Sequence, residues 1–225
     1  MKGYELYMKE KQIRYRQGVK WSIFYMIIYS VLTILFMYIE PKIIKNILGI
    51  IGLIFVVIYV FGIKYKKEYL FLFGLISMFF VMHIGIAVGS LLNIESVITI
   101  GITVSIMDVL SFTKYGKNTP NAKAMSNIKF MSKLIVYGKT KNNELVPTRG
   151  LGDYLYYAIW IVGIHSLSNN LWAYAIAALL IFIGTLGDCI IIGYMYKKES
   201  YKGFPATIIP FLLVFIFYVV LYFYI

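Results

Sequence analysis

The sequence has few of the residues that most soluble enzymes use for catalysis or metal binding. It contains one cysteine (Cys189) and two histidines (His83 and His165), and charged residues make up only 14% of the chain. A lone cysteine excludes an intramolecular disulfide and a cysteine-based zinc site. The histidines have no second histidine or cysteine nearby in sequence, so neither builds a metal site. We therefore expect no metal and no cofactor.

Extended polar segments are also scarce, because 60% of the residues are hydrophobic and the mean hydropathy is +0.78. This composition is typical of a multi-pass integral membrane protein, which we place in the cell membrane with the lipid bilayer as a partner. The net charge of +12 would suit nucleic acid if the cations shared one solvated face. They lie instead in short stretches between apolar runs, so we expect no nucleic-acid partner.

Seven apolar runs are long enough, or nearly so, for the roughly 20 residues that a helix needs to cross a membrane. They cover residues 21–39, 47–63, 69–92, 96–112, 150–168, 171–196 and 204–225. The sequence thus predicts an all-α, polytopic membrane protein with seven transmembrane helices in a single membrane domain. Its parts are a basic cytoplasmic tail (1–20), a four-helix half (21–112), a cytoplasmic loop (113–149) and a three-helix half (150–225).

The lysines and arginines divide unequally between the two sides of this arrangement. Of the 22, 20 fall on the side of the N-terminal tail and only Lys42 and Lys45 on the other. Basic residues concentrate in cytoplasmic connections of membrane proteins. The distribution therefore predicts a cytoplasmic N-terminus and an external C-terminus.

The loop from 113 to 149 is the only long connection, and its second half allows two interpretations. Residues 128–137 combine apolar and basic side chains, as in a helix at the membrane surface. The stretch from Leu134 to Tyr137, with Asn142-Asn143 and Leu145-Val146 after it, fits a short strand and turn equally well. Periodicity does not choose between them.

The two types of acidic residue lie in different parts of the sequence. All seven glutamates lie in tails, connections or the edges of apolar runs, whereas the three aspartates, Asp108, Asp153 and Asp188, lie inside the runs. An acid within the membrane costs on the order of 2.5 to 3.5 kcal/mol even on the mild insertion scale, and such residues usually serve a function. The aspartates are therefore the candidates for a functional site.

Asp108 and Asp153 are expected at similar depth. Asp108 lies six residues before Lys114, and Asp153 follows the basic loop by a few residues. At about 1.5 Å per residue their carboxyls lie roughly 9 Å and 6 Å below the cytoplasmic boundary, on consecutive antiparallel helices. Asp188 is expected deeper, at roughly 13 Å. We interpret Asp108 and Asp153 as a facing pair and give Asp188 a structural or tuning role.

Two prolines mark the start of the last apolar run. Pro205 suits a helix start, but Pro210 loosens the first turns and frees backbone groups. A membrane protein tolerates free backbone groups only where they line a cavity or meet a partner. Non-helical backbone at the depth of two carboxylates is therefore a candidate peptide-docking edge.

Three motifs together resemble the presenilin and signal peptide peptidase family of intramembrane aspartyl proteases, and most of all its compact archaeal members. The motifs are Met107-Asp108, Gly150-Leu151-Gly152-Asp153 and Pro205-Ala206-Thr207. The family has nine spans where seven are expected here, a tyrosine at the position of Met107, and a leucine at that of Thr207. The first difference implies that two N-terminal helices of the family have no counterpart here, and the others imply altered specificity or reduced activity.

The resemblance implies an aspartic-type endopeptidase that cleaves a transmembrane helix or signal peptide. It assigns catalysis to Asp108 and Asp153. It assigns substrate binding to Gly150, Leu151, Gly152, Pro205, Ala206 and Thr207. Two carboxylates a few ångströms apart share one proton, so one activates water while the other polarises the scissile carbonyl.

Three other functions stay open at this point. Prepilin and preflagellin peptidases also carry Gly-x-Gly-Asp, but their first aspartate comes much earlier in the fold. Membrane carboxylates also mark proton- or ion-coupled transporters, although no internal repeat is visible in this sequence. The third alternative is an inactive relative that acts as a membrane chaperone or assembly subunit.

Overall fold

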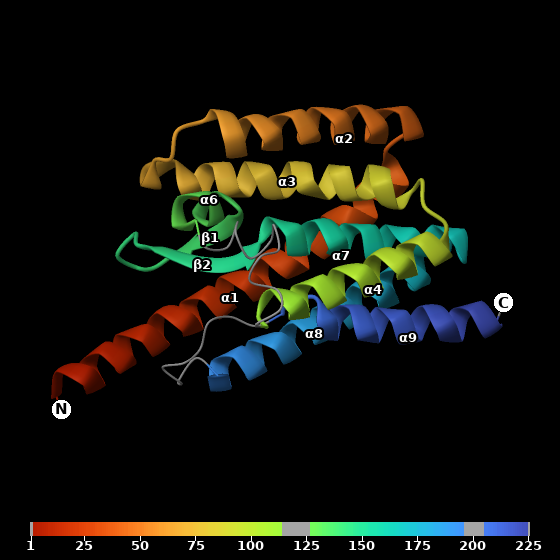
Figure 1. The fold of residues 1–225 in the computed structure, drawn as a ribbon. Helices are drawn as coiled ribbons and strands as arrows, with labels where there is room; N and C mark the ends of the chain where they lie inside the picture. Colours follow the sequence, from red (N-terminus) through yellow and green to blue (C-terminus); the bar gives the residue numbers. More distant parts are fainter. Residues whose placement is uncertain (1, 114–126, 196–204, 225) are drawn as a thin grey trace.

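The computed structural model describes residues 2–113, 127–195 and 205–224, which are predominantly helical. Figure 1 shows α2 and α3 packed together along one side of α7 and the α8–α9 pair along the other, with the start of α1 and the end of α9 at opposite ends. The seven long helices are α1 (Lys2–Ile39), α2 (Lys42–Val57), α3 (Leu70–Gly89), α4 (Ile94–Ser111), α7 (Leu151–Gly163), α8 (Leu171–Met195) and α9 (Ile208–Tyr224).

Five helices in the described ranges are long and apolar enough to cross a membrane. These segments are Glu10–Ile39, Lys42–Gly62, Lys67–Gly89, Ile94–Ser111 and Leu171–Met195. The second includes the π-helical segment η1 (Ile58–Gly62), and the third begins with the 3-10 turn η2 (Lys67–Tyr69). With 17 and 13 residues, α9 and α7 are shorter.

The shortest long helix, α7, lies in the centre of the molecule. It contacts α1, α3, α4 and α8, and its Tyr154, Tyr157 and Trp160 side chains are fully buried. The expected run 150–168 is thus wrong in its bounds, since α7 gives way to the 3-10 turn η4 (Ile164–Ser166). Its start is set by Gly150, whose extended backbone (φ −71°, ψ 147°) ends a strand.

The loop before α7 contains both structures that the sequence allowed. A short helix α6 (Ile128–Lys133) is followed by an antiparallel hairpin of β1 (Ile135–Lys139) and β2 (Leu145–Gly150). Asn143 adopts φ 60° in the turn, a conformation that asparagine tolerates better than most residues. The preceding residues of the loop, 114–126, lie outside the described part.

Trp21 and Tyr25 on α1 hold the hairpin in place. The Trp21 indole N–H donates to the Lys139 carbonyl at 2.8 Å, and the Tyr25 hydroxyl donates to the Tyr137 carbonyl at 3.0 Å. Near the turn, Arg14 donates to the Glu144 carboxylate at 2.5 Å, and this hydrogen bond lowers the pKa of Glu144. The hairpin therefore has a defined position over the end of the helix bundle.

The first helix and one loop lysine differ from expectation. The basic tail, expected as a separate segment at the membrane surface, continues without a break into α1 because residues 1–20 contain no proline. Lys133, counted as a solvated loop cation, is 7% exposed. Its ammonium donates to the carbonyls of Tyr59 and Val60 at 3.2 and 2.9 Å, which satisfies acceptors at the end of a helix.

The last helix begins at Ile208, four residues after the expected start at Phe204, which lies outside the described residues. Pro205, Ala206 and Thr207 precede it in a non-helical segment. Pro210 falls in the first turn, where its missing N–H breaks no helical hydrogen bond. The loosened backbone expected around Pro210 is therefore confined to residues 205–207.

Candidate active site

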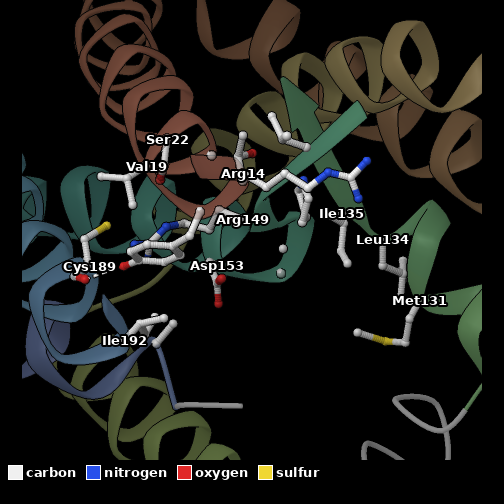
Figure 2. A pocket seen from close by; sticks show the side chains of 18 of the residues that line it. Arg14, Val19, Ser22, Met131, Leu134, Ile135, Arg149, Asp153, Cys189 and Ile192 are labelled. Atoms are coloured by element: carbon white, nitrogen blue, oxygen red, sulfur yellow. Dashed lines mark hydrogen bonds between the residues drawn. The ribbon is translucent and has the colours of Figure 1, made fainter. Parts of the chain in front are cut away.

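A cavity of about 700 Å³ lies where the hairpin meets the middle of α1, the start of α7 and the last turns of α4 and α8 (Figure 2). Asp108 of α4 and Asp153 of α7 both line it. The two residues come from different helices and border the same space. Two acids that are 45 residues apart in sequence thus share one chamber.

Asp153 occupies the first turn of α7, directly after β2. Figure 2 shows its carboxylate pointing into the cavity. Leu151 anchors the junction, since its side chain is buried and its N–H donates to the Leu134 carbonyl at 2.7 Å. A strand followed at once by a helix therefore fixes the position of the carboxylate.

The two glycines of the motif leave space beside Asp153. A Cβ added at Gly152 would meet no atom within 4 Å, and one at Gly150 would lie 3.4 Å from the Asp153 Oδ2 atom, an ordinary contact. Neither glycine is thus required by close packing in this structure. Both line the cavity, where a methyl group would reduce the space available to a bound peptide.

Asp108 is held by the segment that precedes α9. Its Oδ2 atom accepts hydrogen bonds from the Thr207 hydroxyl at 2.9 Å and the Thr207 backbone N–H at 3.4 Å. Thr207 is buried and Ala206 lines the cavity. Met107 is 39% exposed and is not part of the lining. The structure therefore brings Asp108, Asp153 and the Pro205–Thr207 segment together and leaves Met107 outside.

The stretch from Leu134 to Tyr137, which the sequence allowed as a strand, borders the cavity only in part. Leu134 and Ile135 line the cavity, but Val136 and Tyr137 from the same stretch are buried and do not. Every residue of β2 lines it instead. The strand that borders the cavity along its whole length is thus β2, of which the sequence had suggested only Leu145-Val146 as part of a strand and turn.

Arg149 is a site residue that the sequence did not identify. It was counted as a cytoplasmic loop cation, yet it is 7% exposed and its Nη1 atom lies 3.5 Å from the Asp188 Oδ2 atom. Asp188 is fully buried on α8, a helix that also contacts α1 and α7. The sequence did carry one signal for this residue: Asp188 lies inside an apolar run, and a buried aspartate needs a positively charged partner.

The remaining candidates for metal chemistry lie elsewhere. His83 is buried with its Nδ1 atom 3.5 Å from the Glu40 carboxylate, and His165 is half-buried at the end of η4. Neither lines the cavity. Across residues 2–113, 127–195 and 205–224, no group of three or more His, Cys, Asp or Glu side chains could hold a metal ion.

The site therefore consists of two acids, a strand edge and a non-helical segment around one chamber. In comparisons with known proteins, no family model, no curated protein and no solved structure matches the chain.

Proposed function

We propose that this chain is an intramembrane aspartyl endopeptidase in which Asp108 and Asp153 form the catalytic pair. The observation that carries the proposal is that carboxylates from two different helices line one cavity beside a strand. Within this proposal the chain crosses the cell membrane seven times, with its N-terminus in the cytoplasm and its C-terminus outside. The hairpin and the cavity then lie at the cytoplasmic end of the bundle.

The chemistry of the proposal starts from two acids that line one cavity. Two adjacent carboxyl groups cannot both ionise at low cost, so the pair holds one proton. The ionised group removes a proton from a water molecule as that water attacks the scissile carbonyl, while the protonated group donates to the carbonyl oxygen. The proton belongs to the pair, and either aspartate can fill either role.

The substrate is a transmembrane helix or a signal peptide that must unwind before cleavage. A helical peptide cannot be attacked easily because its carbonyls are engaged in hydrogen bonds and its backbone is enclosed by side chains. The β2 strand offers an alternative partner, because an extended peptide can add to the edge of a strand. The Pro205–Thr207 segment is also non-helical and lies at the level of Asp108, to which the Thr207 N–H donates.

Substitution of either aspartate tests the proposal. We expect Asp108→Asn and Asp153→Asn each to abolish cleavage of a reporter transmembrane peptide by the purified protein in lipid, with unchanged expression and thermal stability. Glu68→Gln is the matched control, because Glu68 is an exposed acid that does not line the cavity. Near-normal cleavage by either asparagine variant would refute the catalytic pair.

Covalent labelling separates a protease from a transporter or an inactive chaperone. A photoreactive inhibitor that mimics the tetrahedral transition state should label the wild-type protein, and excess unlabelled inhibitor should compete. Transition-state analogues bind far more tightly than substrates only where the catalytic groups are arranged for the reaction. A protein that transports ions without cleaving peptides would show no competed labelling.

A further inference from the structure

The arginine directly before Gly150 is unusual because its charge is almost completely buried. Arg149 is 7% exposed, and it ends in the interior between β2, α7 and α8. Removing a guanidinium from water costs several kcal/mol unless it is paired and hydrogen-bonded. A buried arginine directly before the Gly150–Asp153 motif therefore needs a structural or functional explanation.

The contacts of Arg149 explain how its charge is accommodated. The Nη1 atom lies 3.5 Å from the Asp188 carboxylate and donates a hydrogen bond to the Tyr157 hydroxyl. The guanidinium also lies 5.5 Å from the centre of the Tyr157 ring, within the range of a cation–π interaction. An ion pair with α8 and a double contact with α7 thus hold the arginine in one orientation.

Tyr157 extends this chain of contacts to the other side of the site. Its hydroxyl donates to the Ala206 carbonyl at 3.3 Å, and the next residue, Thr207, donates twice to Asp108. The contacts therefore run from Asp188 through Arg149 and Tyr157 to the Pro205–Thr207 segment and then to Asp108. Arg149 also directly precedes the glycine–leucine–glycine stretch that carries Asp153.

We propose that Arg149, with Asp188 as its counter-ion, is a positioning residue that fixes the two catalytic carboxylates relative to each other. It acts on Asp108 through Tyr157 and the Ala206–Thr207 backbone, and on Asp153 through the end of β2. A planar guanidinium suits this role because it can address an acid and a hydroxyl in fixed directions at once. The inference rests on the proposed function, since it gives these residues a purpose in aspartyl catalysis.

Tyr157→Phe is the most direct test, because it keeps the ring and removes only the hydroxyl that links Arg149 to Ala206. We expect kcat to fall at least tenfold while KM stays within twofold of the wild-type value. Tyr154→Phe is the matched control, as Tyr154 is also fully buried on α7 but its hydroxyl has no hydrogen-bond partner among the described residues. A Tyr157→Phe enzyme with wild-type kcat would overturn the proposal.

Substitutions of the ion pair separate positioning from neutralisation of charge. Arg149→Lys keeps the charge but not the two fixed directions, so we expect normal thermal stability with a reduced kcat. The paired variant Arg149→Met/Asp188→Leu removes both buried charges, and such replacements often preserve folding. It should likewise fold with reduced kcat, and wild-type kcat in either folded variant would overturn the proposal.

A readout that needs no activity keeps the two proposals distinguishable. In a Cys189→Ser background, Ala206→Cys places a thiol on the segment that Tyr157 holds. We expect Tyr157→Phe to accelerate its modification by a small thiol reagent at least fivefold, and Tyr154→Phe to leave the rate unchanged. If the wild-type protein does not cleave the reporter peptide, the proposed protease function is refuted. If Tyr157→Phe leaves the modification rate of Ala206→Cys unchanged, the positioning role is refuted.

Discussion

At the scale of single residues, the two proposed catalytic aspartates are held in different ways. Asp153 takes its position from the backbone, because it lies one turn after a strand that ends at Gly150. Asp108 lies late in α4 and takes its position from side-chain and backbone donors of Thr207. The orientation of Asp108 is therefore more sensitive to a single substitution outside its own helix.

Thr207→Val tests this sensitivity, since valine has nearly the same shape but no hydroxyl. A hydrogen bond to a charged group contributes about 1.5 to 3 kcal/mol, so loss of the 2.9 Å bond to Asp108 should lower kcat roughly 10- to 100-fold. Peptide-cleavage kinetics on the purified protein measure the effect. Thr207→Ser keeps the hydroxyl and should retain most of the activity; equal losses in both variants would show that the hydroxyl is not responsible.

The sequence could predict the aspartates but not their arginine partner. Carboxylates in apolar runs are rare enough to identify from composition and position alone. Arg149 lies between a loop rich in lysine and the start of an apolar run, where an exposed cation is the ordinary expectation. Its burial depends on the approach of α8 to the end of β2, a tertiary contact that no local pattern records.

At the scale of helices and strands, close approach of backbones decides where the acids lie. The Phe211 ring of α9 packs directly against Gly101 of α4, and a Cβ built on this glycine would lie 1.9 Å from the ring. About two turns later, the same helix presents Asp108 towards Thr207. Contact between α4 and α9 at Gly101 therefore supports the geometry of the site.

Gly101→Ala should separate these two helices. Overpacking a well-filled contact costs about 1 to 3 kcal/mol, so we expect a lower melting temperature together with reduced cleavage. Gly62→Ala is the matched control, because its added Cβ would meet only Ile58, at 3.8 Å. Thermal unfolding in detergent and peptide cleavage give the two readouts. Full stability and activity in Gly101→Ala would indicate that α4 and α9 do not depend on this contact.

The helices were predicted better than the connections. Long apolar runs identify helices reliably because length and composition suffice, and each expected run overlaps one of the long helices of the described residues. The bounds of α7 were wrong at both ends, because Gly150 pairs with Ile135 in the hairpin and because the helix gives way to a 3-10 turn after Gly163. The stretch 128–137 fitted both a helix and a strand because it contains part of each. Its first residues form α6, and β1 begins in its second half.

At the scale of the whole molecule, the arrangement has two unlike ends. Figure 1 places the start of α1 and the hairpin at one end, and the end of α9 at the other. The basic residues Arg14 and Arg149 line the cavity at the hairpin end, and Lys133 ends α6 just before β1. An odd number of membrane crossings would place the start of α1 and the end of α9 on opposite sides of the bilayer.

Cysteine labelling tests the number and direction of the crossings. In a Cys189→Ser background, single cysteines replace three exposed residues: Arg16 on α1, Leu91 after α3 and Tyr222 near the end of α9. Seven crossings with a cytoplasmic N-terminus require that a membrane-impermeant reagent modify Leu91→Cys and Tyr222→Cys in intact cells. Arg16→Cys should react only after the cells are permeabilised, because α1 then begins in the cytoplasm. Modification of Arg16→Cys and Tyr222→Cys from the same side would mean an even number of crossings, and the excess of positive charge would then no longer locate the cavity at the cytoplasmic surface.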